Sequence, residues 1–189
     1  MSDRIEILQT PNPDALKFAV PGRLVERGPY EYHAGDDLST SPLARRLLDL
    51  SGVDMAMVAD GFVTVQRTGG QEWEVLGAEV LTVLHDFLGS YEMAVYEDEV
   101  APPDAPQVAL PETETERQIV ALLEEYVRPA VAEDGGEVIY RGFRDGIVQL
   151  TLRGACGTCP SSLTTLKMGV ERLLQEHVPE VRGVENIAL

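Results

Sequence analysis

The organisation of this 189-residue chain centres on Gly154-Ala155-Cys156-Gly157-Thr158-Cys159-Pro160-Ser161-Ser162. The alternating residues 147–153 before it predict a strand, and the helical spacing of the leucines and Val170 after it predicts a helix. Pro160 is favoured in the first turn of a helix, so Cys159 takes the N-cap position. The only two cysteines of the chain therefore lie on a loop that enters a helix.

The segments on either side of this loop predict a small α+β domain over residues 113–189. Thr113 and Glu116 fit a capping box, and an amphipathic helix follows over residues 119–130. Pro129 falls within that helical pattern, where we expect it to kink or end the last turn. Two strands joined by a turn at Asp145-Gly146 come next, and residues 184–189 predict a last strand after the second helix. The predicted order is helix, strand, strand, helix, strand.

Toward the N-terminus, an acidic, proline-rich stretch separates this domain from another. Residues 101–111 hold four of the twelve prolines, which predicts an extended linker over residues 93–112. Residues 1–92 predict a second small α+β domain without an evident catalytic site. Its helices are expected from Ser41-Pro42 onward and over residues 73–87. Its strands are expected at 4–9, 15–20, 30–33, 53–58 and 62–66.

Charge and composition exclude several classes of function. The chain has 15 basic and 32 acidic residues, so we expect it to repel nucleic acid and anionic lipid. No apolar run approaches the roughly 20 residues needed to span a bilayer, and residues 1–6 show no leader pattern. We therefore predict no nucleic-acid or membrane partner and a cytoplasmic protein. In that reducing compartment a Cys-x-x-Cys pair indicates metal or redox chemistry rather than a structural disulfide.

The position of the two cysteines favours the thiolate form that binds metals. Unpaired backbone N–H groups and the positive end of the helix dipole stabilise negative charge at this point. Gly154 and Gly157 allow close approach of the backbone and leave N–H donors for inorganic sulfide. Hydroxyl groups in the first turns fit helix capping and hydrogen bonding to a bound group equally well; these are Ser161, Ser162 and Thr165.

A Cys-x-x-Cys pair permits three chemical interpretations. A thioredoxin-like thiol–disulfide oxidoreductase needs more strands and helices than the 30 residues after Cys159 can supply. Zinc needs four ligands, and the three histidines, His33, His85 and His177, have no ligand spacing relative to the pair. Iron–sulfur clusters are commonly held by four thiolates, which two chains together provide across a two-fold axis. A zinc ion bridging two chains is geometrically just as possible, so this alternative stays open.

Longer segments resemble a known family, the Nfu-type iron–sulfur carriers. Residues 154–162, Val127-Arg128-Pro129-Ala130-Val131-Ala132-Glu133-Asp134-Gly135-Gly136 and Val178-Pro179-Glu180-Val181 resemble the NifU C-terminal domain. Thr10-Pro11-Asn12-Pro13-Asp14-Ala15-Leu16-Lys17-Phe18 resembles the Nfu N-terminal domain. The chain departs from the family at Glu137, where aspartate is common.

The resemblance implies that Cys156 and Cys159 bind an iron–sulfur cluster, with [4Fe–4S] favoured over [2Fe–2S]. It implies a homodimer through the cysteine loop when the cluster is bound, with upstream scaffold proteins and apo iron–sulfur proteins as partners. The chain lacks a phosphate-binding glycine loop, and we expect an assembly and transfer protein rather than an enzyme. A thiol–disulfide oxidoreductase and a zinc-bridged structural dimer are the alternatives.

Overall fold

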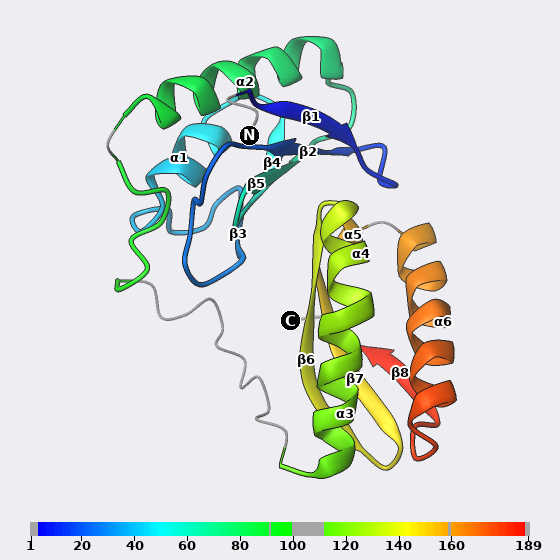
Figure 1. The fold of residues 1–189 in the computed structure, drawn as a ribbon. Coiled ribbons are helices and arrows are strands. Elements are labelled where there is room, and N and C mark those ends of the chain that lie inside the picture. Colours follow the sequence, from blue (N-terminus) through cyan, green and yellow to red (C-terminus); the bar gives the residue numbers. More distant parts are fainter. Residues whose placement is uncertain (1–3, 91, 100–111, 159, 188–189) are drawn as a thin grey trace. The chain divides into compact units, whose positions relative to one another are not determined.

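The computed structural model describes residues 4–90, 92–99, 112–158 and 160–187 (Figure 1). The chain divides into two compact units, Met1–Pro103 and Asp104–Leu189. Each unit combines helices with one sheet, which confirms the predicted α+β class with two domains. The exact boundaries at 92/93 and 112/113 stay a prediction, and residues 100–111 of the predicted linker lie outside the described residues. None of the helices in the described ranges is long and apolar enough to cross a membrane.

The first unit is a five-stranded antiparallel sheet with two helices on one face. The strand order is β1-β2-β5-β4-β3. The Asp60-Gly61 turn joins β4 to β5, and Gly61 has the positive φ of +78° that this turn needs. The elements are β1 (Glu6–Gln9), β2 (Ala15–Ala19), β3 (Tyr30–His33), α1 (Pro42–Leu48), β4 (Val53–Ala59), β5 (Phe62–Arg67) and α2 (Trp73–Leu88).

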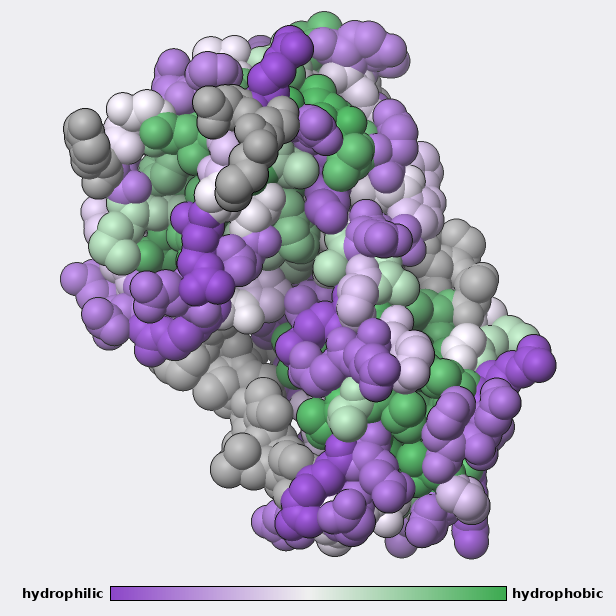
Figure 2. Space-filling view, viewed as in Figure 1, coloured by the Kyte–Doolittle hydropathy of each residue, from purple (hydrophilic) through white to green (hydrophobic). Residues whose placement is uncertain are grey.

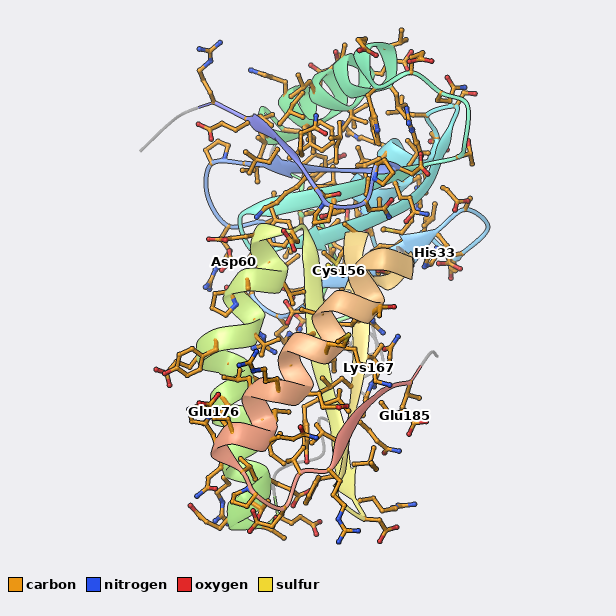
Figure 3. All side chains as sticks on the ribbon, turned by 90° about the vertical axis from the view of Figure 1, so that its right-hand side faces the viewer. His33, Asp60, Cys156, Lys167, Glu176 and Glu185 are labelled. Carbon is orange, nitrogen blue, oxygen red and sulfur yellow. The ribbon has the colours of Figure 1, made fainter. Side chains whose placement is uncertain are left out.

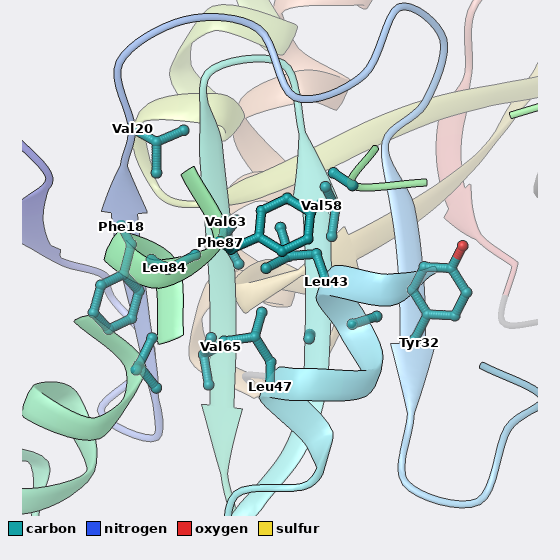
Figure 4. Packing of buried hydrophobic residues seen from close by; sticks show 14 of the residues in the cluster. Phe18, Val20, Tyr32, Leu43, Leu47, Val58, Val63, Val65, Leu84 and Phe87 are labelled. Carbon is teal, nitrogen blue, oxygen red and sulfur yellow. The ribbon is translucent and has the colours of Figure 1, made fainter. Parts of the chain in front are cut away.

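The core of the first unit lies between this sheet and its helices (Figure 4). Alternate residues of the strands meet the apolar stripes of α1 and α2, as the period of each element requires. Ser41 caps α1 as predicted, since its hydroxyl accepts a hydrogen bond from the Ala44 N–H at 3.1 Å. The labelled residues in Figure 4 that build this layer include Phe18, Val63, Leu43, Leu47, Leu84 and Phe87.

Residues at the beginning of the predicted linker pack against the first unit. Ala94 and Val95 are buried in the core of the first unit. The Glu97 carboxylate accepts hydrogen bonds from the backbone N–H groups of Glu26 and Arg27 at 2.9 and 2.7 Å and from the Tyr30 hydroxyl at 2.8 Å. Acidic composition suggested a solvated tether here, but this carboxylate finds three donors and is buried.

Glu97→Gln is expected to destabilise the first unit by about 1.5–3 kcal/mol at pH 7, because a neutral amide replaces a carboxylate that accepts three hydrogen bonds. Burial raises the pKa of Glu97, but its hydrogen bonds outweigh burial, so the folded pKa is below the ordinary value. The stabilisation is therefore present at neutral pH and is lost as the pH falls below about 4.5 through the folded pKa.

Urea unfolding followed by the fluorescence of Trp73, the single tryptophan, measures this effect in the first unit. The difference between the parent and Glu97→Gln should be large at pH 7 and small near the acid limit. Asp98→Asn is the control, since the Asp98 side chain is fully exposed in its ion pair with Arg27 and its loss should leave the midpoint unchanged. An equal midpoint for Glu97→Gln and the parent at pH 7 would refute the role of Glu97.

The second unit packs helices on one face of a three-stranded sheet of order β6-β7-β8 (Figure 1). Strand β6 pairs with β7 in the antiparallel direction, and β8 pairs with β7 in the parallel direction. The predicted capping box is confirmed, with reciprocal hydrogen bonds between Thr113 and Glu116. The elements are α3 (Glu114–Leu122), η1 (Leu123–Val127), α4 (Arg128–Glu133), β6 (Gly136–Arg144), β7 (Ile147–Gly154), α5 (Ala155–Thr158), α6 (Pro160–His177) and β8 (Gly183–Asn186).

Pro129 does not end the helical path, but the α-helical pattern is interrupted directly before it, where a kink or an end was predicted. The segment passes through one π-helical turn, η1, in which the Arg128 N–H donates to the Leu123 carbonyl oxygen. Pro129 then lies in the first turn of α4, where its missing N–H is tolerated. The wider turn makes room for the ring, so the helical path continues to Glu133.

Candidate metal centre

Cys156 lies at the end of the second unit where β7 leads into α6 (Figure 3). It belongs to the short α5 turn, and the N–H of its neighbour Ala155 donates to the Gly135 carbonyl oxygen at 3.2 Å. Cys156 is only 2% exposed and packs with the core residues of this unit. Cys159 lies outside the described residues, so the structure places one of the two predicted ligands. The side chains of Ser161, Ser162 and Thr165 also lie outside them, and their roles stay a prediction.

Glycines bring the backbone close to the cysteine turn. A methyl group on Gly136 would lie 2.8 Å from the Cys156 Sγ and 3.0 Å from the Arg153 carbonyl oxygen. A methyl group on Gly157 would lie 3.0 Å from the Leu152 carbonyl oxygen. These three distances are shorter than normal contacts, so a side chain at either position would force neighbouring atoms to move. Gly157 was predicted to allow a close approach; the role of Gly136 was not predicted.

A buried carboxylate on the strand that begins beside Cys156 forms an ion pair with an exposed arginine. The Glu137 Oε1 lies 2.7 Å from the Arg128 Nε, and the Arg128 Nη1 donates to the Glu124 Oε2 at 2.6 Å. Burial raises the pKa of the Glu137 carboxyl, and the Arg128 guanidinium opposes only part of that rise. Glu137 was noted in the sequence only as a departure from the common aspartate. Its partner comes from another element, so no sequence spacing indicated the pair.

Two of the three histidines have polar partners of their own. His33 lies on β3 of the first unit with its Nε2 3.1 Å from Glu31, and the His177 Nδ1 lies 2.9 Å from the Leu173 carbonyl oxygen near the end of α6. Within the described ranges, no three His, Cys, Asp or Glu side chains gather where they could hold a metal ion. Figure 2 shows hydrophilic residues interspersed with hydrophobic ones on the surface of each unit.

Comparisons with known proteins cover both units. Residues 5–91 match the family described as scaffold protein Nfu/NifU N terminal, and residues 119–185 match the NifU-like domain. A human protein named "NFU1 iron-sulfur cluster scaffold homolog, mitochondrial" is 38% identical over 185 residues, covering 97% of this chain and 71% of that protein. This chain belongs to the Nfu scaffold family. The identification confirms the resemblance drawn from the sequence segments.

Two further comparisons describe the extent of the similarity to Nfu proteins. A Drosophila erecta protein of the same name is 38% identical over 185 residues. The match covers 97% of this chain but only 64% of that protein's length. A solution NMR structure of a NifU-like protein from Saccharomyces cerevisiae matches with a TM-score of 0.44 at 26% identity, covering 49% of this chain and 83% of that one.

The predicted cytoplasmic location is wrong on this comparison. The human and Drosophila Nfu proteins are named as mitochondrial, which points to the mitochondrion rather than the cytoplasm. The prediction rested on the first residues of the chain and on the lack of an apolar run long enough to span a bilayer. Neither observation distinguishes the cytoplasm from another compartment of the cell.

Proposed function

We propose that this Nfu-family chain is an iron–sulfur cluster scaffold or carrier, in which Cys156 and Cys159 of two copies hold one cluster. The observation that carries the proposal is a Cys-x-x-Cys pair at the entrance to α6, in a chain that matches both Nfu domains. Each chain supplies two thiols, and four thiolates are the common ligand set of a cluster. A homodimer follows from this stoichiometry, and a [4Fe–4S] cluster is favoured over [2Fe–2S].

The cluster is the cargo of this protein, and its transfer is an exchange of ligands. Thiolates of a recipient replace those of Cys156 and Cys159 on the iron atoms, and no electrons need to change hands. A cluster held at an interface between two chains lies near the surface, where recipient thiolates can reach it. Apo iron–sulfur proteins are the proposed recipients and upstream scaffold proteins the proposed donors. Since the first unit has no cysteine, cluster binding belongs to the second unit.

Anaerobic reconstitution with iron and sulfide is expected to give a brown dimer with about one [4Fe–4S] cluster per two chains. Iron and sulfide analysis should then find about two iron atoms per chain, whereas a shared [2Fe–2S] cluster would give about one. Light scattering gives the mass of the species, and Mössbauer spectroscopy separates the two cluster types. A colourless monomer after reconstitution would contradict the proposal.

The two alternatives predict different results with the same protein. A zinc-bridged dimer would contain zinc and no sulfide after purification without air. A thiol–disulfide oxidoreductase would reduce insulin disulfides as a metal-free monomer. We expect iron and sulfide in the first assay and no reductase activity in the second.

A further inference from the structure

The surroundings of Cys156 show how its thiol is held in this chain. Cys156 is 2% exposed and lies among the core residues of the second unit. A cluster shared by two chains must contact a thiolate that faces the partner chain. The buried position of the thiol is therefore a different position from the one in which it binds a shared cluster.

Gly136 creates the space that the thiol occupies. This glycine begins β6 opposite Gly154, the last residue of β7. Its backbone lies outside the left-handed region, so its φ does not require glycine. The steric environment does, because a methyl group here would lie 2.8 Å from the Cys156 Sγ and 3.0 Å from the Cys156 Cβ. The buried thiol of Cys156 thus lies against the space that a side chain at position 136 would fill.

The segment that carries Cys156 is short and lies at the end of the β6–β7 ladder. Gly154 ends β7 with a φ of +67°, and α5 is one turn long. The segment is tied to the preceding turn by the hydrogen bond between the Ala155 N–H and the Gly135 carbonyl oxygen. Local openings of such segments cost less free energy than global unfolding.

We propose that Gly136 is a positioning residue that stores the Cys156 thiol inside the second unit when no cluster is bound. Cys156 becomes available to iron only after the segment 154–158 opens. The stored thiol is protected from oxidants and electrophiles until the cluster arrives, since the thiolate must be exposed to react. The statement that Cys156 becomes available to iron rests on the proposed function, because it takes Cys156 as a ligand. The storage of the thiol does not rest on it.

Alkylation of Cys156 by iodoacetamide tests the storage directly. In a Cys159→Ser chain Cys156 is the only thiol, and mass spectrometry follows its modification. We expect the rate in the native, metal-free chain to be at least about 30-fold below the rate in unfolding concentrations of urea. Equal rates in the two conditions would overturn the proposal.

Gly136→Ala in the same background tests the role of the glycine. The added methyl group would lie 2.8 Å from the Cys156 Sγ and 3.0 Å from the Arg153 carbonyl oxygen, so the thiol must shift. Alkylation is therefore expected to become about tenfold faster. Gly169→Ala is the matched control, since it makes the same change in the same unit and its methyl group would meet no atom within 4 Å. This control should react within about twofold of the parent. A parent-like rate in Gly136→Ala would overturn the proposal.

A second measurement covers the case in which Gly136→Ala folds poorly. Its urea midpoint is compared in chains with Cys156 and with Cys156→Ala, which removes only the Sγ. Part of the midpoint lost through Gly136→Ala should return when the Sγ is absent, because the two groups compete for one space. No recovery would show that the methyl group and the thiol do not meet.

The outcomes separate this proposal from the proposed function. Alkylation needs no iron, so rapid alkylation of the native chain would refute storage and leave the ligand role intact. A Cys156→Ser chain that still bound a cluster would refute the ligand role and leave storage intact. In chains with both cysteines, Gly136→Ala should load iron and sulfide faster than the parent, and an unchanged loading rate despite faster alkylation would refute the opening step.

Discussion

Cys156→Ser is expected to abolish cluster binding, reducing the iron retained after anaerobic reconstitution from about two atoms per chain to below about a tenth of that value. The reason is chemical, because iron in clusters selects soft thiolate ligands and a serine hydroxyl stays protonated at neutral pH. In a shared site one substitution removes two of the four thiolates. Cys159→Ser is expected to have the same effect. Iron and sulfide analysis with the visible absorbance of the cluster measures the loss.

A matched control separates the loss of a ligand from a general effect on α6. Met168→Ser removes a sulfur-containing side chain from the same helix, but Met168 is 68% exposed and has no thiolate to offer. This variant should retain the full cluster, and far-UV circular dichroism should show all three variants folded. Unchanged iron content in Cys156→Ser and Cys159→Ser would exclude both residues as ligands.

The order of elements could be predicted because each one carries a local signal. Alternation over 147–153 predicted β7, and the spacing of Trp73 to Phe87 predicted α2 within one residue of its end. The capping box at Thr113 fixed the start of α3. These signals depend on residues close together in the chain, whose effect on the backbone is direct.

Contacts between residues that are distant in the chain could not be predicted from the sequence. Glu97 lies in an acidic stretch that leads into the prolines. Its carboxylate nevertheless accepts hydrogen bonds from backbone N–H groups about 70 positions earlier in the chain. Composition and spacing carry no information about such partners, because tertiary packing decides them.

The two candidate ligands rest on the sequence alone, whereas the residues that surround Cys156 are seen only in the structure. The spacing of Cys156 and Cys159 and the proline behind them indicated metal chemistry from a few adjacent residues. The space left by Gly136 and the ion pair of Glu137 with Arg128 come from β6 and α4, which the sequence separates from the loop. A glycine that is required for volume rather than for its φ has no local signature.

Leu174→Ala is expected to lower the stability of the second unit by about 2–5 kcal/mol, a large part of the roughly 5–15 kcal/mol that holds a domain folded. Leu174 is fully buried on the face of α6 that packs against the core of the second unit. Removing its side chain leaves a cavity that the surrounding residues only partly fill. Urea unfolding followed by far-UV circular dichroism measures the shift. Met168→Ala on the exposed face of α6 is the control and should stay within about 0.5 kcal/mol of the parent.

Loading with a cluster should restore part of the stability that Leu174→Ala removes. A ligand that binds only the folded state stabilises it by mass action, and α6 begins directly after the cysteine pair that would hold the cluster. The urea midpoint of Leu174→Ala should therefore rise on anaerobic loading, and it should not rise when Cys156→Ser is added. Equal midpoints for Leu174→Ala and Met168→Ala would show that α6 does not depend on this core contact. A rise on loading in the chain that also carries Cys156→Ser would show that iron binds elsewhere than at the cysteine loop.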